Sequence, residues 1–238
     1  MPTEPTTTSD GFDMYAENYD EALNQGLSVT GEDKQYFARQ RILWLSNRLE
    51  KSQSKPMRVL DYGCGTGTTT SLLLEFLHAE SVIGVDSSTR SLERARKDPS
   101  PNCEFFLNAD YPGREEIDLV YCNGVFHHIP PSERAGELAH VMRCLRPGGL
   151  FALWENNPWN PGTRYVMSRI SFDRNAVKLS PTYARALLRQ SGFELIRTDF
   201  LFFFPRFLRT LRWIEPFISG LPFGGQYLVL CRRPASRT

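Results

Sequence analysis

Short apolar runs alternate with amphipathic stretches through the middle of the chain. The runs cover residues 59–62, 82–86, 103–107, 117–122 and 150–154. Most of the stretches between them have the spacing and length of an α-helix, but residues 109–116 are too few for one. Strands that alternate with helices are typical of βαβ units and a parallel sheet. The pattern therefore predicts an α/β core over residues 57–155 in which the third strand connects to the fourth by a loop.

After the core, the pattern predicts a helix, two strands and an amphipathic insertion. The helix covers residues 181–191 and ends at Gly192, and the strands begin at Phe193 and Gln226. The insertion, residues 205–225, has an apolar side and a basic side. The apolar side carries Phe207, Leu208, Leu211, Ile214 and Phe217 or Ile218. The basic side carries Arg206, Arg209 and Arg212. Such a segment can lie on a membrane, cover an apolar substrate pocket, or pack on the sheet or a dimer partner. We favour packing, the commonest use of an apolar stripe.

Two helices are expected before the core. The first covers residues 12–27, and the second runs to about Lys51, with Thr30 and Asp33 as a capping box. The apolar face of the first carries Phe12, Tyr15, Tyr19 and Leu23, and that of the second carries Phe37, Ile42, Leu45 and Leu49. The polar residues 1–10 are expected to form a disordered tail.

The first apolar run ends in a glycine-rich turn that leads into a helix. Asp61 is followed by Gly63, Gly65 and Gly67, which leave backbone N–H groups accessible to a ligand. The dinucleotide fingerprint requires a third glycine where this chain has Thr68, so that pattern fails. A carboxylate beside the turn would repel a pyrophosphate but suits a ligand with an ammonium group and no phosphate. S-adenosylmethionine fits this description.

Five segments, in this order, resemble the motifs of the class I S-adenosylmethionine-dependent methyltransferases. They are residues 59–67, 82–86, 103–110, 117–130 and 145–150. The resemblance implies an α/β fold: a Rossmann-like, doubly wound, seven-stranded sheet, mostly parallel with an antiparallel last strand, with helices on both faces. It also implies one methyltransferase domain over residues 11–238. Within that domain, residues 11–55 would form a helical lid, residues 56–155 the cofactor-binding core, and residues 156–238 the acceptor side.

The resemblance also implies which residues bind the cofactor. They are Tyr19, Asp61, Gly63, Cys64, Gly65, Gly67, Asp86, Ser87, Asp110 and Asn123. Asp86 lies where the family's ribose-binding carboxylate lies, although an aspartate here can also cap the next helix. Asp110 belongs to the adenine-contacting segment, although it also suits a turn. Tyr19 is preferred to Tyr15 for the methionine end of the cofactor, and core packing of both tyrosines is equally open.

His127, His128 and Glu155 are the candidates for catalysis. The histidines follow the fourth strand and Glu155 follows the fifth, where acceptor groups are met in this fold. An imidazole titrates near neutrality and can take a proton from the acceptor. Packing or a loop hydrogen bond is the alternative for the histidines, and a simple turn is the alternative for Glu155. Adjacent side chains diverge and no further ligand lies at metal spacing, so no metal site is expected.

Composition narrows the partners and the compartment. The chain has 238 residues with a net charge of +1, which favours neither nucleic acid nor an acidic partner. Its five cysteines are odd in number and lack C-x-x-C spacing, as expected in a reducing compartment. The polar N-terminal residues show no secretion signal. The expected location is cytoplasmic, extending to the membrane surface if residues 205–218 make a peripheral contact.

The expected reaction is in-line transfer of a methyl group from S-adenosyl-L-methionine, with S-adenosyl-L-homocysteine as the product. Nucleic-acid amino-methyltransferases of this fold carry an Asn/Asp-Pro-Pro-aromatic motif, which the residues after Asn123 lack. A small molecule is therefore the favoured acceptor: a natural product, a sugar or a lipid-linked intermediate, methylated on O or N. The alternative is a non-catalytic cofactor-binding or scaffold subunit. The protein is expected to be a monomer or a homodimer.

Overall fold

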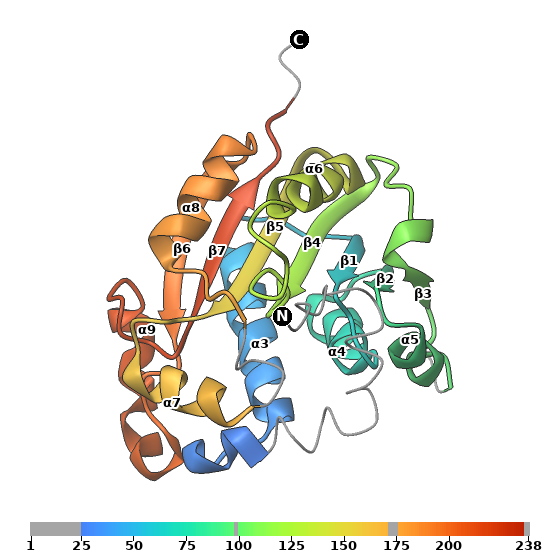
Figure 1. The fold of residues 1–238 in the computed structure, drawn as a ribbon. Coiled ribbons are helices and arrows are strands. Elements are labelled where there is room, and N and C mark those ends of the chain that lie inside the picture. Colours follow the sequence, from blue (N-terminus) through green and yellow to red (C-terminus); the bar gives the residue numbers. More distant parts are fainter. Residues whose placement is uncertain (1–24, 98–99, 171–175, 236–238) are drawn as a thin grey trace, which may run out of the picture.

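The computed structural model describes residues 25–97, 100–170 and 176–235. Its centre is a seven-stranded sheet of order β3-β2-β1-β4-β5-β7-β6 (Figure 1). The strands are β1 Arg58–Tyr62, β2 Ser81–Asp86, β3 Cys103–Leu107, β4 Ile117–Asn123, β5 Leu145–Asn156, β6 Glu194–Leu201 and β7 Gln226–Arg232. The first five strands are parallel to one another, and β7 runs antiparallel to both of its neighbours, β5 and β6. The expected doubly wound fold with an antiparallel last strand is confirmed.

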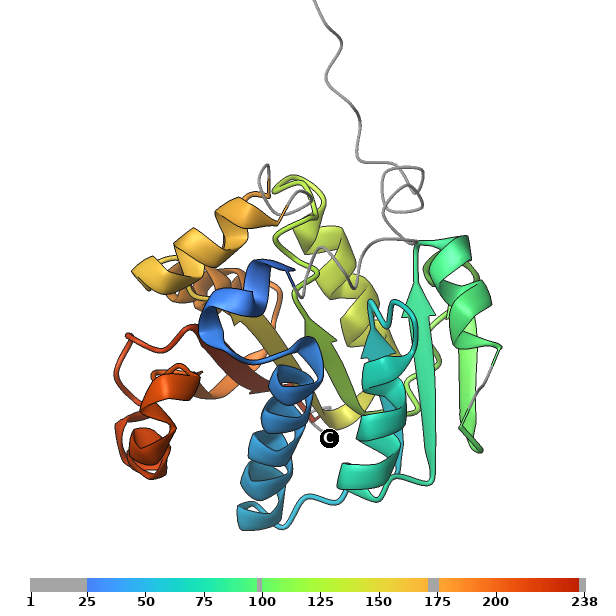
Figure 2. The ribbon, with the colours of Figure 1, turned by 90° about the horizontal axis from the view of Figure 1, so that it is seen from below.

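Helices cover both faces of this sheet (Figures 1 and 2). The main helices are α3 Lys34–Lys51, α4 Thr68–Leu77, α5 Thr89–Ala95, α6 Arg134–Cys144 and α8 Pro181–Gln190. One apolar core joins α3 and α4 to the sheet, and a second joins α6 and α8 to the opposite face. Helix α5 packs on Phe105 of β3 in a smaller cluster. Burial of these side chains, at roughly 25 cal/mol per Å² of apolar surface, is the main force that holds the layers together.

Short helices and turns connect the layers at the carboxyl edge of the sheet. They are η1 Ser28–Thr30, η2 Asn108–Asp110, α7 Pro161–Arg169, η4 Arg206–Ile214 and α9 Glu215–Ile218. The link from β3 to β4 contains only η2 and a loop, as the short spacing predicts. No helix in the described parts of the chain combines the length and apolarity needed to cross a membrane.

The start of the second N-terminal helix differs from the prediction. The side chain of Asp33 caps α3 by accepting a hydrogen bond from the Tyr36 N–H at 2.8 Å. Thr30 lies inside η1, where its hydroxyl donates to the Leu27 carbonyl, so it cannot serve as the cap. Of the four residues expected to be buried, Phe37 is only half-buried because it faces a cavity. The expected first helix falls almost wholly among residues outside the described ranges.

The insertion does not pack its apolar side on the sheet, so that part of the prediction is wrong, while packing on a dimer partner stays a prediction. Residues 206–214 form a 3-10 helix with a break at Leu208, followed by the single turn of α9. A 3-10 helix has three residues per turn, so the apolar stripe expected for an α-helix is not formed. Phe207 is 80% exposed, Trp213 70% and Phe217 80%. This surface is therefore apolar and open.

Candidate functional site

The glycine turn joins β1 to α4 with all three glycines in left-handed conformations. Gly63, Gly65 and Gly67 have φ values of 78°, 54° and 79°. A Cβ on Gly63 would lie 2.2 Å from Cγ2 of Val125, whereas one on Gly65 would meet nothing within 4 Å. Gly63 is therefore required by internal packing. Gly65 faces open space, as a backbone that receives a ligand must.

Asp86 fastens this turn to the end of β2. One of its carboxylate oxygens accepts the Gly65 N–H and the other accepts the Ser88 N–H, each at 2.8 Å. Helix α5 is capped by Ser88, whose hydroxyl accepts the Ser91 N–H at 3.1 Å. The alternative that Asp86 caps this helix is therefore wrong. Ser87, beside it, is exposed.

Asp61 lies beneath the turn and is almost completely buried. Its carboxylate accepts a hydrogen bond from the Thr70 hydroxyl at 2.7 Å. Burial raises the pKa of this carboxyl to about 7, while the Thr70 hydrogen bond and the charge of Arg41 act in the opposite direction. A cationic group bound next to Asp61 would favour its ionised form.

The other expected cofactor residues lie along the same edge of the sheet. Cys64 is buried in the turn, Asn123 ends β4, and Asp110 is exposed in η2. Asn108, which the motif reasoning did not single out, donates to the Tyr62 hydroxyl at 3.0 Å, while its buried Oδ1 has no hydrogen-bond partner. Tyr19 and Tyr15 lie outside the described residues.

This edge fits the cofactor that the motifs imply. Gly65 leaves space where a side chain would otherwise stand, and Asp86 places a carboxylate beside it. The unsatisfied Oδ1 of Asn108 is an acceptor in the segment where an adenine amino group is expected. A neutral cradle with a nearby carboxylate suits a ribose and an adenine better than a pyrophosphate.

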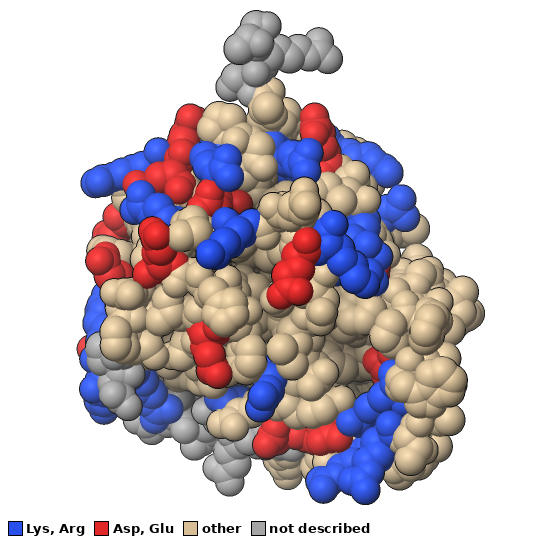
Figure 3. Space-filling view, turned by 180° about the vertical axis from the view of Figure 1, so that it is seen from behind, with Lys and Arg blue, Asp and Glu red and all other residues tan. Residues whose placement is uncertain are grey.

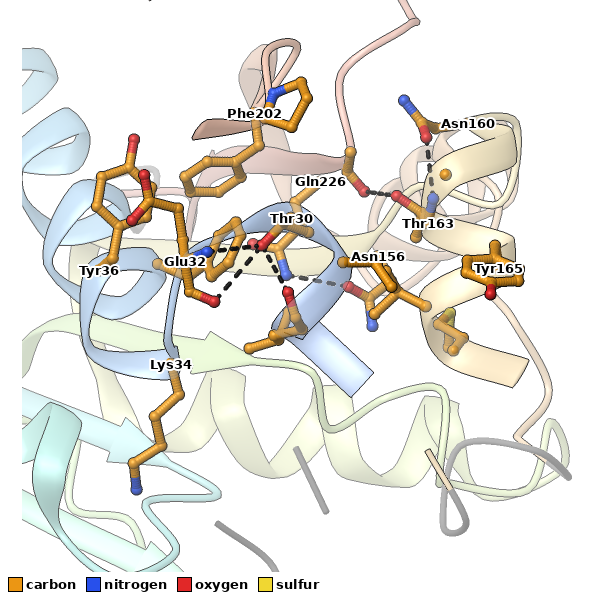
Figure 4. Close-up of a pocket in the computed structure, with 18 of the residues that line it drawn as sticks. Thr30, Glu32, Lys34, Tyr36, Asn156, Asn160, Thr163, Tyr165, Phe202 and Gln226 are labelled. Carbon is orange, nitrogen blue, oxygen red and sulfur yellow. Dashed lines mark hydrogen bonds between the residues drawn. The ribbon is translucent and has the colours of Figure 1, made fainter. Parts of the chain in front are cut away.

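Asn123 and Gly124, at the end of β4, also line a cavity of about 480 Å³. Figure 4 shows α3 and η1 on one wall, through Thr30, Glu32 and Tyr36, and α7 on another. Its apolar lining consists of Leu27, Val29, Phe37, Val166, Met167, Ile170, Phe202, Phe203, Phe204, Pro205 and Phe207. Cavities of this size hold small organic molecules.

The structure brings His127 and Glu155 together. Nδ1 of His127 lies 2.7 Å from Oε2 of Glu155, with the side chains 4% and 1% exposed. His127 and His128 both line the cavity, and their ring centroids are 4.0 Å apart at 47°, so the expectation that they diverge is wrong. Both lie in the turn that follows Gly124, which is closed by a hydrogen bond from the His128 N–H to the Val125 carbonyl at 2.9 Å. Oε1 of Glu155 is buried and accepts no hydrogen bond in the structure. The described residues contain no group of three potential ligands that could hold a metal ion.

Arg41 is a site residue that the sequence reasoning missed. Its side chain is 6% exposed and lines the cavity. Nε donates to the Tyr121 hydroxyl at 3.2 Å, and Nη1 donates to Oε1 of Gln226 at 2.9 Å. Gln226 in turn donates to Asn156 at 3.0 Å. No described carboxylate forms an ion pair with Arg41. The sequence feature that could have identified it is an arginine next to Ile42, within the apolar stripe of α3. A charged side chain is rarely buried there unless a polar group or a ligand pairs with it.

Comparison with known proteins gives consistent matches. The family model described as a methyltransferase domain matches residues 59–149. An uncharacterized methyltransferase of Synechocystis sp. is 32% identical over 151 residues, which cover 60% of this chain and 70% of that protein. A trans-aconitate 2-methyltransferase of Acidovorax sp. is 36% identical over 104 residues, covering 43% of this chain and 39% of that protein. The chain therefore matches about two fifths of the length of the Acidovorax relative.

Solved structures share the fold. A putative methyltransferase of Haloferax volcanii, in complex with the Trm112 methyltransferase activator, aligns with a TM-score of 0.66 at 18% identity. The alignment covers 98% of this chain and 100% of that chain. At this identity the likeness concerns the fold alone. Together with the ordered motifs and the Synechocystis relative, these matches show that the chain belongs to the class I S-adenosylmethionine-dependent methyltransferases.

Proposed function

We propose that this protein transfers a methyl group to a small molecule held in the cavity, with His127 as the general base. S-adenosylmethionine, when bound, supplies the methyl group on a sulfonium that is a good leaving group. The observation that carries the proposal is the buried pair of His127 and Glu155 at the wall of the cavity. Burial of two ionisable groups costs desolvation free energy. We therefore infer that this pair is kept because it holds the imidazole in one orientation.

His127 would act on an acceptor that arrives protonated, such as a hydroxyl; a carboxylate arrives ionised and needs no base. The Glu155 carboxylate would accept a hydrogen bond from the Nδ1–H of His127. This hydrogen bond fixes the tautomer and stabilises the imidazolium that forms. The acceptor's proton then goes to Nε2 as the new bond to carbon forms. Glu155 does not line the cavity, so it is a positioning residue. The ring of His128, which lies tilted against that of His127, would help to hold it in place.

The cavity lining supports an amphipathic acceptor. The aromatic wall from Phe202 to Phe204 suits an apolar body, and Arg41 offers a buried cation to an anionic group. The Acidovorax relative is named for trans-aconitate, a molecule with several carboxylates. The first acceptors to try are therefore acids that also carry a hydroxyl group, in which the carboxylate would pair with Arg41 and the hydroxyl would give its proton to His127. The cofactor would be held by Asp86, the open space at Gly65 and Asn108.

The first test is calorimetric titration with S-adenosylhomocysteine. Micromolar binding by the wild type, lost in Gly65→Arg, is expected because the open space at Gly65 would be filled. Absence of binding by folded wild-type protein would overturn the assignment of the site.

The second test measures transfer of labelled methyl groups to a panel of carboxylic acids and alcohols. His127→Asn should keep the binding of S-adenosylhomocysteine while kcat falls about 100-fold or more, the usual contribution of a general base. Glu155→Gln should lower kcat and shift its pH profile. Binding without transfer to any acceptor would favour the alternative, a non-catalytic cofactor-binding subunit. Full activity of His127→Asn would remove the proposed base.

A further inference from the structure

The cavity opens at the surface between two segments whose exposed side chains line it: residues 157–170, which include α7, and residues 202–225. Tyr165 of α7 and Phe207 of η4 both line it. The two segments are fastened to each other, since Asn160 donates to the Phe223 carbonyl at 2.6 Å and Asn157 donates to the Pro222 carbonyl at 3.0 Å. They lie on the same side of the molecule in Figures 1 and 2.

Exposed apolar side chains gather on these two segments. Eight of the twelve large apolar side chains that are exposed in the described chain belong to them. The eight are Trp159, Tyr165, Phe207, Leu211, Trp213, Phe217, Leu221 and Phe223. Figure 3 shows the consequence on the right-hand edge, over η4 and α9, where uncharged surface protrudes beside a run of basic residues. A concentration of this kind marks a surface that is used for contact.

The charges on the same segments are nearly all positive. Residues 158–170 and 202–225 contain five arginines, no lysine and one acid, Glu215. Arg164, Arg169, Arg206 and Arg209 are exposed. Glu215 is turned inward, where its carboxylate accepts the N–H groups of Phe202 and Phe204 at 3.2 Å. The outer surface therefore presents cations with almost nothing to neutralise them locally.

We propose that this surface docks on a membrane whose headgroups are anionic, with the cavity mouth facing the bilayer. Tryptophan and phenylalanine enter the interfacial region, and arginines pair with the headgroup phosphates. A second protein would need its own apolar and acidic residues to match the exposed aromatic side chains and the arginines. A lipid surface already provides an apolar interior and anionic headgroups. The aromatic lining continues from the rim into the cavity, so an acceptor with an apolar tail can pass between bilayer and site. This docking is separate from the chemistry at His127.

The test is co-sedimentation of the full chain with vesicles of phosphatidylcholine alone or mixed with phosphatidylglycerol. Wild-type protein should bind the mixed vesicles and be released by high salt, since exposed ion pairs are screened. Trp213→Ser/Phe217→Ser should weaken the partition about tenfold or more, because two aromatic side chains no longer enter the interface. Arg164→Gln/Arg209→Gln, whose guanidiniums pair with no described carboxylate, should bind mixed and neutral vesicles alike.

Two matched controls address surface changes of the same kind elsewhere. Ile196→Ser removes an exposed apolar side chain from β6, and Arg185→Gln/Arg189→Gln removes two exposed cations from α8. Neither should change vesicle binding. All variants should keep the affinity for S-adenosylhomocysteine, so failure of docking is distinguishable from failure of the cofactor site. Binding to neither vesicle, or equal losses in the controls, would overturn the proposal. So would a wild-type dimer that Trp213→Ser/Phe217→Ser converts to a monomer, since the surface would then join two copies.

Discussion

The backbone N–H of Gly65 donates to the carboxylate of Asp86 across a distance of 2.8 Å. This contact ties the turn after β1 to the end of β2, although 21 residues separate the two positions. The carboxylate thus orders the glycine turn, and we expect it also to bind the ribose of the cofactor. Its two roles can be separated by experiment.

Asp86→Asn should weaken the binding of S-adenosylhomocysteine about tenfold or more while the protein stays folded. The amide oxygen can still accept one N–H. The negative charge is lost, however, and with it the strengthening of the hydrogen bonds from the Gly65 and Ser88 N–H groups and of those expected from the ribose. Calorimetric titration gives the affinity and circular dichroism checks the fold. Glu93→Gln, which removes an exposed acid from the neighbouring helix α5, serves as the control. A larger loss in the control than in Asp86→Asn would contradict the ribose assignment.

Arg41→Gln should weaken the binding of a ligand carboxylate by about 30-fold or more, because the buried cation that would pair with this carboxylate is removed. S-adenosylhomocysteine and its decarboxylated analogue separate the two sources of that carboxylate. If only the intact compound loses affinity, Arg41 binds the cofactor. If neither loses affinity but KM for an acidic acceptor rises, Arg41 binds the acceptor. Arg39→Gln, an exposed arginine over the Phe76 ring, is the control. No change in any measurement would leave Arg41 a purely structural residue.

Asp61 should make the cofactor-free protein less stable as pH rises. Burial lifts the pKa of its carboxyl from 3.8 to about 7, so between these values the folded protein keeps a proton that the unfolded chain releases. The unfolded state then binds fewer protons, and the free energy of unfolding falls with rising pH, by up to ~4 kcal/mol. The fall begins near the lower pKa and is complete above the higher one.

Urea unfolding of wild type and Asp61→Asn at several pH values isolates this contribution. The difference in unfolding free energy between the two proteins should change through the window and be flat on either side. Parallel curves across the whole range would show that Asp61 keeps an ordinary pKa in the folded state.

Gly63→Ala should destabilise the protein more than Gly65→Ala does. Both positions have positive φ, which costs an alanine about 1 kcal/mol. At Gly63 the new methyl group would also collide with Val125, which adds roughly 1–3 kcal/mol of overpacking. Thermal and urea unfolding measure the difference. Equal losses at the two positions would mean that the loop after β4 shifts to make room.

The sheet and the cofactor motifs were predictable because their signals are local. Apolar runs, strand ends and the glycines at 63, 65 and 67 are read from neighbouring residues, and tertiary packing did not override them. The pair of His127 and Glu155 is different. Both residues were named as candidates, but their contact depends on the register that sets Asn123 of β4 beside Trp154 of β5. Only the folded sheet fixes that register.

The conformation of the insertion and the contacts of Arg41 could not be predicted from local sequence patterns. The stripe of residues 207–218 assumes an α-helical period, and the chain adopts a 3-10 helix instead. Arg41 has a neighbour in the core, Ile42, and gains a role only through Tyr121 and Gln226, which are 80 and 185 residues away. A cavity assembled from such distant parts leaves little trace in any one stretch of sequence.

The position of β7 in the sheet bears on the order in which the protein can be assembled during translation. Strand β6 pairs only with β7, and β7 fills the space between β6 and β5. While the ribosome is still adding residue 225, β6 has no strand to join and the partner of Arg41 at position 226 does not yet exist. The turn that would receive the cofactor can form long before this moment, since domains begin to fold from the N-terminal side. A nascent chain would therefore form the glycine turn first and complete the contact between Arg41 and Gln226 at the wall of the cavity last, so an incompletely made molecule lacks a finished cavity.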